Sequence, residues 1–580
     1  MLVPQANGDQ SEIAVDPGWL RLLHFQDSKS IIDDPAFFLA PAGKSDSAAE
    51  LRATIEAFRY NPLTQCEFPA RSRFLRQQGF HFNSVPCPHL KSFLKKLDPK
   101  SLTLVYPASF FNNPASMFGH TFLRVDSANG LKLTSTAINY GAAALDPVGF
   151  IYAFKGLLGY YQGYFTTEPY HQHVKSYIKQ ENRDIWEFEL NFSKADTIYI
   201  LEHLWELQGH WADYYFLSEN CSSMVLELLS IIDHDLVRGW PKPWVIPIDT
   251  IFDLKNRNHI KAAKYRPSDT NRFRHLIKGL SIDTALLAAK IATEQLNPEI
   301  LSENTDLTTN EKMDGLSLAA GLIDRRYRRG EIEREQFASL YLETLTRRSR
   351  LPRKTNNQKP LPSPIEGQPS AMVAVGYGNQ KEPYSSLELR LTAHDLLDAP
   401  HKQDAASSLT IGKLSLRATD ERMSVYEATV MEFWSLPVWD PVLKPYSWRL
   451  GIHAKRESDI QDGKYQTYIL DGATGMTFGH THMIWYGLAQ SNIRFRVHTN
   501  QRLSLAFGIE NGLIGSLGRS RIQLSLLTQR FWNEIISHRH TLELALIRNF
   551  RFGAIVIKAA NQKSHEQYLS SGHVEWRTYF

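Results

Sequence analysis

The chain has 580 residues, with 65 basic and 61 acidic side chains and a formal net charge of +4. Because the charge is close to balanced, a general nucleic-acid role has no electrostatic support and no nucleic-acid partner is expected. Aromatic residues make up 11% of the chain, which is typical of a protein with aromatic girdles at a membrane interface. No apolar run reaches about 18 residues, so no membrane-spanning helix is expected.

The N-terminus has no recognisable secretory signal peptide. Met1–Pro4 is followed by polar residues, without a basic segment or an apolar segment. Taken alone, this start predicts a cytoplasmic protein, but the strand pattern described below outweighs it, and we expect the natural start to lie upstream of Met1. Residues 1–16 are expected to form a disordered leader. Residues 17–97 are expected to form a small accessory domain of helices and loops rich in Pro and Phe.

The chain contains three cysteines, at positions 66, 87 and 221. Cys66 and Cys87 lie 21 residues apart in a loop-like stretch, a spacing that allows a disulfide in an oxidising compartment. The alternative is that all three are buried thiols. If the first two are paired, Cys221 is left as the free thiol.

Residues 98–268 mix strand and helix patterns, which predicts an α+β domain. Short runs of β-branched and aromatic residues mark the strands, and longer amphipathic runs mark the helices. The expected strands are 102–106, 121–125, 131–140 and 185–190; the expected helices are 194–207 and one that begins at about Cys221.

Residues 269–349 are expected to be mainly helical, and residues 350–366, with four prolines, form a linker. In the helical segment Leu316, Ala320, Ile323 and Tyr327 recur at helical spacing. A basic patch lies on another face of the same helix. It could contact anionic headgroups, or it could simply be solvated. The patch consists of Arg325, Arg326, Arg328 and Arg329.

From residue 367 to Phe580 the pattern alternates with a period of two, as in Ile493, Phe495 and Val497 against Arg494, Arg496 and His498. Such segments recur about 12 times, which predicts an antiparallel transmembrane β-barrel of the outer membrane. A soluble β-sandwich also alternates. Two features favour the barrel: basic residues recur on the inner face, and the chain ends on an aromatic residue, as in proteins that the barrel-assembly machinery inserts.

Cys221 is the candidate nucleophile of the α+β domain. A thiol reacts as the thiolate, which an imidazole and a helix N-terminus both favour. Asn220 is a suitable N-cap that would put Cys221 in the first helical turn, where backbone amides could form an oxyanion hole. His120 is the candidate base, and Asn139 on an adjacent strand could orient its ring. The alternative is a hydrogen-bonded core histidine and a small buried thiol.

The segments Asn113–Asp126, Ile138–Gly141 and Asn220–Ser222 resemble the periplasmic domain of the lipoprotein N-acyltransferase family Lnb. The resemblance covers roughly residues 95–265. It implies a circularly permuted papain-like fold in which histidine precedes cysteine, as in the related lecithin retinol acyltransferase. By position, His120 and Cys221 match the motif histidine and cysteine, whereas Asn139 matches only by its strand. The C-terminal barrel departs from the better-known Lnb members.

A metal site is not expected. The histidines that might suggest one do not have ligand spacing with a carboxylate in register. No phosphate-binding glycine loop or nucleophile elbow occurs either, so no cofactor is expected. The histidines concerned are His171, His173, His203 and His210.

These observations predict a Gram-negative envelope protein, a barrel in the outer membrane that carries a periplasmic thiol domain. The expected activity is acyl transfer through a Cys221 thioester, with a phospholipid or a lipoprotein as substrate. One alternative is a periplasmic cysteine peptidase or amidase that acts on peptidoglycan or protein, with water as the acceptor. The other is a non-catalytic pore or scaffold.

Overall fold

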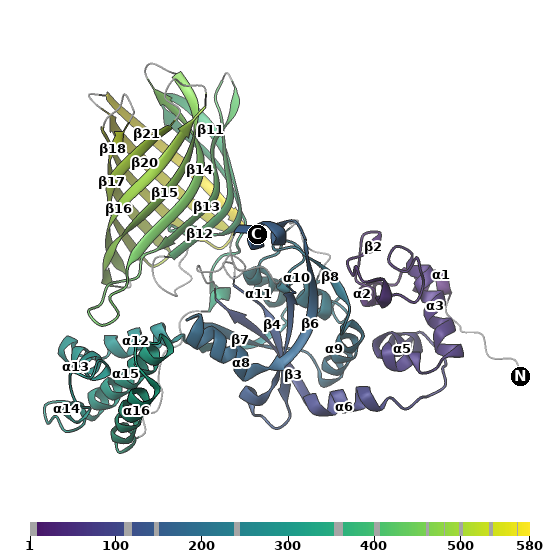
Figure 1. Cartoon of the computed structure of the whole chain (residues 1–580). Helices are drawn as coiled ribbons and strands as arrows, with labels where there is room; N and C mark the ends of the chain where they lie inside the picture. The colour runs from purple at the N-terminus through teal and green to yellow at the C-terminus, as the bar shows by residue number, and fades with distance from the viewer. Residues whose placement is uncertain are drawn as a thin grey trace, which may run out of the picture. The chain divides into compact units, whose positions relative to one another are not determined.

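The computed structural model describes residues 9–108, 119–143, 150–236, 244–352, 363–398, 407–420, 422–459, 463–480, 482–497, 503–532, 538–564 and 567–580 (Figure 1). The chain divides into two compact units, Met1–Arg272 and Phe273–Phe580. The first unit contains the candidate thiol, and the second contains a helical segment and the barrel.

The first unit begins with a small helical region. The expected disordered leader is wrong for residues 9–16, because Asp9 caps a short helix and Ile13 and Ala14 are buried. Residues 1–8 of that leader lie outside the described residues. Cys66 and Cys87 form a disulfide, with an S–S distance of 1.97 Å. The elements are α1 (Gln10–Ile13), α2 (Pro17–Leu22), β1 (Phe25–Gln26), β2 (Lys29–Ser30), α3 (Ser47–Tyr60), α4 (Thr64–Glu67), α5 (Pro69–Gln77) and α6 (Pro88–Leu97).

An antiparallel sheet of seven strands follows, in the order β8-β6-β5-β4-β3-β7-β9. The expected strand 131–140 begins later, at Thr136, because residues 132–134 form a 3-10 turn. Strands β6, β8 and β9 were not expected, since their alternation is short or interrupted by Gly and Lys. The strands are β3 (Pro99–Pro107), β4 (Phe122–Ser127), β5 (Thr136–Ala142), β6 (Tyr161–Pro169), β7 (Ile185–Leu190), β8 (Trp211–Tyr214) and β9 (Ile260–Arg266).

Helices cover both faces of this sheet, so apolar side chains are buried on each face. The strand register puts Leu104 and Leu123 on one face and Val105 and Phe122 on the other. Tyr170 of α8 packs in a cluster with Val105 and Phe122, while α9 and α10 pack on β3, β4 and β5 (Figure 1). The helices are α7 (Phe150–Leu157), α8 (Tyr170–Val174), α9 (Lys194–Leu207), α10 (Cys221–Leu229) and α11 (Pro247–Asn256).

The second unit begins with a helical segment whose core surrounds Phe273 and Leu316. The basic patch on its long helix forms ion pairs: Arg328 with Asp324 at 3.2 Å, and Arg326 with Glu294 at 3.6 Å. These pairs favour the solvated interpretation over a headgroup contact. The helices are α12 (Asp269–Lys278), α13 (Ile282–Ala292), α14 (Glu299–Ser302), α15 (Thr309–Arg328) and α16 (Arg334–Ser349).

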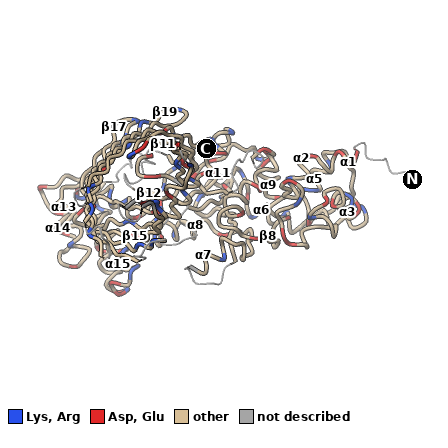
Figure 2. The backbone as a smooth tube through the Cα atoms, turned by 90° about the horizontal axis from the view of Figure 1, so that it is seen from above, with Lys and Arg blue, Asp and Glu red and all other residues tan. Residues whose placement is uncertain are grey.

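A closed barrel of 12 antiparallel strands completes the described chain, because β10 pairs with both β11 and β21. Figure 2 shows the ring of strands from above. The strands are β10 (Met372–Gln380), β11 (Glu382–His394), β12 (Ser407–Ala418), β13 (Met423–Ser435), β14 (Ser447–Asp459), β15 (Gly463–His480), β16 (Met483–Arg496), β17 (Leu503–Leu517), β18 (Ser520–Trp532), β19 (His538–Phe550), β20 (Gly553–Ser564) and β21 (Gln567–Tyr579).

Along the barrel strands, apolar side chains that face outward alternate with polar side chains that face the lumen. This confirms the arrangement expected of a transmembrane barrel. On β16, Ile493 and Phe495 are exposed on the outer face, whereas Arg494 is buried toward the lumen. Arg494 forms an ion pair there with Glu457, and the same carboxylate lies 3.1 Å from the guanidinium of Arg539. Closure into a single ring excludes the β-sandwich. No helix in the described ranges is long and apolar enough to cross a membrane.

Candidate active site

Cys221 is the first residue of α10, and Asn220 caps this helix as expected. The side-chain Oδ1 of Asn220 accepts hydrogen bonds from the backbone N–H of Ser222 at 2.8 Å and of Ser223 at 3.3 Å. Its Nδ2 donates to the carbonyls of Phe216 at 3.0 Å and Val245 at 2.7 Å. Because both ends of the buried amide are engaged, the cap fixes the start of the helix and the position of the thiol.

His120 reaches the thiol from the start of β4. The chain enters this strand through Gly119, whose φ of +94° is in the left-handed region, and a Cβ there would lie 2.7 Å from the Tyr106 ring. The His120 Nε2 donates to Oδ1 of Asn139 on β5 at 2.7 Å. A second hydrogen bond joins the imidazole to the Cys221 side chain. Because Nε2 is engaged with Asn139, Nδ1 is the nitrogen available to the sulfur, and contacts join the three predicted residues.

The protonation of this pair follows from its surroundings. Burial acts to raise the pKa of the Cys221 thiol, but the neighbouring His120 and the hydrogen bonds to the sulfur lower it overall to about 7. Burial acts to lower the pKa of His120, but the Cys221 charge and the hydrogen bonds of the ring to Cys221 and Asn139 raise it overall. Each group thus favours the charged form of the other, as in a thiolate–imidazolium pair.

The backbone amides of the first turn do not form the open oxyanion hole expected from the sequence. Those of Ser222 and Ser223 are held by the Asn220 side chain. The amide of Cys221 donates to the hydroxyl of Tyr214 at 3.4 Å. The expectation is wrong because the residue that makes a good cap also occupies the amides that it caps. Tyr214, at the end of β8, is therefore the additional polar group beside the thiol.

Two further residues of the site were missed by the sequence analysis. Arg183 donates to the carbonyls of Ala108 at 2.6 Å and Pro107 at 2.8 Å, and so holds the end of β3 beside His120. Its guanidinium lies 4.9 Å from the centre of the Tyr177 ring, which borders His120. Neither residue belongs to a recognisable motif. Of the motif segment Asn113–Asp126, residues 113–118 lie outside the described residues.

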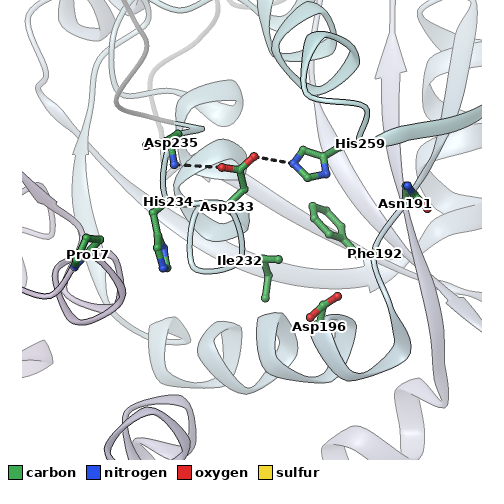
Figure 3. Close-up of a pocket in the computed structure, with 9 residues that line it drawn as sticks. All are labelled: Pro17, Asn191, Phe192, Asp196, Ile232, Asp233, His234, Asp235 and His259. Carbon is green, nitrogen blue, oxygen red and sulfur yellow. Dashed lines mark hydrogen bonds and ion pairs between the residues drawn. The ribbon is translucent and has the colours of Figure 1, made fainter. Parts of the chain in front are cut away.

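A cavity of about 620 Å³ lies beyond the other end of α10 (Figure 3). Its polar groups bond to one another: His259 pairs with Asp233 at 2.7 Å, and the same carboxylate accepts from the Asp235 amide at 3.2 Å. The lining does not include the thiol or its histidine, so this cavity is separate from the candidate catalytic residues. It is lined by Pro17, Asn191, Phe192, Asp196, Ile232, Asp233, His234, Asp235 and His259.

The four histidines considered for a metal site do not gather at one point. His173 of α8 is 3.3 Å from Glu168, and His210 is 2.8 Å from Asp34. His203 of α9 is buried and bonds to Glu206 at 2.9 Å, while His171 is exposed. In the part of the chain that the structure describes, no three residues of the metal-binding types gather in a way that could hold an ion.

Family models match three stretches of the chain. Residues 89–257 match the Lnb N-terminal periplasmic domain. Residues 361–579, which include the barrel, match a domain of unknown function, DUF7840. Residues 11–78 match another, DUF7843. No curated protein matches the chain.

Among solved structures, the chain is similar to outer-membrane porins. The KdgM porin is 8% identical, with 36% of this chain and 99% of that chain covered and a TM-score of 0.22. The NanC porin is 6% identical, with 36% and 100% covered and a TM-score of 0.24. A loop-deletion mutant of OmpT from Vibrio cholerae is 7% identical, with 36% and 97% covered and a TM-score of 0.20.

The family match and the barrel together identify the architecture. The matched range contains His120, Asn139 and Cys221, and the barrel has apolar side chains on its outer face and ion pairs in its lumen. Residues 89–257 thus match the Lnb N-terminal periplasmic domain, and the C-terminal part of the chain is a closed barrel of 12 strands with the alternation of a transmembrane barrel.

Proposed function

We propose that this protein is an envelope thiol acyltransferase, which moves an acyl chain from a phospholipid or lipoprotein ester to an amine through a thioester on Cys221. The observation that carries the proposal is the line of contacts from the Cys221 thiol through His120 to Asn139, at the start of a capped helix. A nucleophile, a base and a group that orients the base are the parts that covalent acyl transfer needs.

In the first step, the Cys221 sulfur attacks the carbonyl carbon of the acyl ester. Where the thiol is still protonated, its proton passes to Nδ1 of His120, so that the imidazolium is present when the tetrahedral intermediate forms. The ester C–O bond then breaks, and the imidazolium protonates the departing alkoxide. The products are an acyl thioester on Cys221 and a lysolipid, in which a free hydroxyl replaces the ester.

In the second step, a neutral amine attacks the thioester carbonyl and forms a C–N bond. His120 takes the proton that the amine loses, and the C–S bond breaks to release the amide and the Cys221 thiolate. The α-amine of a lipoprotein's terminal cysteine is the acceptor that we favour. No cofactor enters either step, because the energy of the ester is conserved in the thioester.

Tyr214 supplies the stabilisation that the first-turn amides cannot. Its hydroxyl oxygen accepts from the Cys221 amide, and the hydroxyl hydrogen is then directed to another acceptor. The oxyanion of the tetrahedral intermediate, which is carried by the carbon bonded to the Cys221 sulfur, would be such an acceptor. Removing one oxyanion donor typically lowers kcat by about 100- to 1,000-fold, and we expect a loss of this size for Tyr214→Phe.

The test uses the full chain in proteoliposomes, with a phospholipid that carries a labelled acyl chain and a diacylated lipopeptide with a free α-amine. Mass spectrometry follows the label. Cys221→Ala and His120→Ala should abolish its transfer to the lipopeptide, whereas His171→Ala, at an exposed histidine of the same unit, should retain it. Full transfer by Cys221→Ala would overturn the proposal.

The same experiment separates the alternatives. A hydrolase would release the label as free fatty acid, with Cys221 required and the lipopeptide unlabelled. A peptidase or amidase would cleave the peptide instead and leave the lipid intact. A pore or scaffold would leave every substrate unchanged, and a thiol-reactive acyl probe would then fail to label Cys221 selectively.

A further inference from the structure

One surface of the first unit is unusually apolar. Helix α7 and the turn that follows it carry five exposed large apolar side chains within ten residues. Ile151, Phe154 and Leu157 recur every three residues, so they share one side of the helix. We name this surface the α7 face; its exposed fractions are 63% for Ile151, 53% for Phe154, 50% for Leu157, 49% for Leu158 and 71% for Tyr160.

This concentration is not matched elsewhere in the described part of the first unit. The other exposed large apolar side chains there are scattered, at Val15, Tyr60, Leu63, Leu131 and Leu133. Single exposed apolar residues are normal on soluble surfaces, whereas a contiguous group marks a contact with another apolar body. The α7 face therefore presents apolar area that another apolar body could cover.

The opposite side of α7 is fixed to the polypeptide that leads to the thiol. The Phe216 amide donates to the carbonyl of Gly156 at 2.9 Å, and the Phe216 ring lies 5.2 Å from that of Tyr152. A Cβ on Gly156 would lie 2.2 Å from the Phe216 ring, and a Cβ on Gly159 would lie 2.2 Å from the Tyr215 ring. Glycine at both positions lets the backbone pack directly on the aromatic rings, so the apolar face is held outward.

The same contacts continue to Cys221. The Phe216 ring lies 6.0 Å from the Tyr214 ring, and the Tyr214 hydroxyl is bonded to the Cys221 amide. Only two aromatic residues thus separate the buried side of α7 from the nucleophile.

We propose that the α7 face lies in the acyl-chain region of the outer membrane's inner leaflet and so holds the first unit at the membrane that supplies its acyl donor. A lipid surface is the occupant that the observations favour, because the same chain carries a barrel whose outer face contacts lipid. The membrane is therefore always within the reach of this unit. The supply of the acyl donor rests on the proposed function, whereas the contact with lipid does not.

The size of the helix suits contact with one leaflet. Its eight residues are far short of the roughly 20 that span a bilayer. A short helix with one apolar side instead lies in the plane of the interface and buries that side among the acyl chains. Tyr160 at the end of the face is of the type enriched at the boundary between headgroups and chains.

The first test places an environment-sensitive NBD fluorophore on the α7 face of the full chain. Ile151→Cys is labelled in a Cys221→Ala background, with Leu131→Cys, at a similarly exposed site of the same unit, as the matched control. Each is reconstituted in vesicles of phosphatidylethanolamine and phosphatidylglycerol that contain a nitroxide-labelled lipid. We expect blue-shifted and strongly quenched emission at 151 and water-like, unquenched emission at 131.

Two results would overturn the proposal. Water-like emission at 151 would mean that the face is not in lipid. Blue-shifted emission without nitroxide quenching would mean that protein covers it, either a second copy or another part of this chain. Because the label is read in an inactive background, a failure of the proposed catalysis would not alter this measurement.

The second test compares two donors, a phospholipid in the bilayer and a water-soluble short-chain thioester. Ile151→Ser combined with Leu157→Ser should lower the ratio of bilayer to soluble turnover about tenfold, because two lipid contacts are lost. Leu131→Ser should leave the ratio unchanged. An unchanged ratio in the double variant would overturn the role in donor supply, even if the fluorophore lay in lipid.

Discussion

In the barrel, each strand directs apolar side chains outward and polar side chains to the lumen, whereas the sheet around Cys221 buries apolar side chains on both faces. On β16, Phe495 faces outward and the neighbouring Arg494 faces the lumen. On β3, the neighbouring Leu104 and Val105 point to opposite faces and both are fully buried. The two regions therefore treat charge differently: the barrel keeps it in a polar lumen, and the sheet must pair any charge that it buries.

Arg124 tests the sheet side of this comparison and has the largest expected effect on stability. It is fully buried and contacts Asp126 at 2.7 Å and Glu187 at 2.9 Å. Arg124→Met would leave these acids without that partner, and we expect the first unit to lose about 3–5 kcal/mol of unfolding free energy. Urea unfolding followed by near-UV circular dichroism measures it.

The matched control is Lys261→Met, which removes an exposed pair with Glu189 at 3.0 Å on the same sheet. Exposed pairs contribute little, so we expect a change below about 1 kcal/mol. The barrel should be unaffected in both variants, as read from its heat-dependent mobility in gels. Equal losses from the two substitutions would contradict the distinction between buried and exposed charge.

Leu544 tests the barrel side with the next largest effect. It lies near the middle of β19 and points outward, while the preceding Glu543 points to the lumen side. Leu544→Arg would put a charge in hydrocarbon, at a cost of about 2–4 kcal/mol in barrel stability, whereas Glu543→Gln should change it little. Folding into bilayers at increasing urea measures both. A tolerated Leu544→Arg would mean that this face does not contact lipid.

The barrel could be predicted almost completely because its information is local. Residues that face the same side alternate along a single strand, so Ile493, Arg494 and Phe495 identify inside and outside without knowledge of their partners. Closure by pairing of β10 with β21 then follows from an even number of such strands. A one-residue error in the pattern would have exchanged the two faces, and none occurred on this strand.

The candidate site could be predicted only in part because its residues come from separate segments. The resemblance and the cap pattern identified His120 and Cys221, and the structure joins them by a hydrogen bond. Tyr214 was missed because it lies in a four-residue strand with no alternation to read. The prediction of an oxyanion hole made of amides was wrong because the cap residue already accepts the hydrogen bonds of those amides. They are therefore not available to a substrate.

Asn139 lies on the sheet and orients the His120 ring, and its replacement has a smaller expected effect on the rate of transfer. Its hydrogen bond helps to raise the pKa of His120, while His120 helps to lower the pKa of Cys221 to about 7. Transfer should rise as pH passes about 7, where the thiolate forms, and fall when His120 loses the proton that it gives to the leaving group. Asn139→Ala lowers the pKa of His120, so the alkaline limb should move to lower pH.

We expect the same variant to slow transfer about 10- to 100-fold, because the ring loses the group that orients it. The exposed Asn129→Ala serves as the control and should keep both the rate and the pH profile. A slower Asn139→Ala enzyme with an unmoved alkaline limb would assign Asn139 a structural role alone. Rates measured from pH 5 to 10 on the soluble thioester separate these outcomes.

Asn220 gives the smallest expected loss of stability and the sharpest information about the oxyanion. Asn220→Ala removes the acceptor for two first-turn amides, at a typical cost of about 1–2 kcal/mol. Asn220→Asp keeps that acceptor and should recover part of the loss.

Removal of the cap also frees the Ser222 and Ser223 amides beside the sulfur. If Tyr214 is the oxyanion donor, these freed amides should not rescue Tyr214→Phe. If the double variant Asn220→Ala with Tyr214→Phe transfers faster than Tyr214→Phe alone, the amides of the helix backbone stabilise the oxyanion instead.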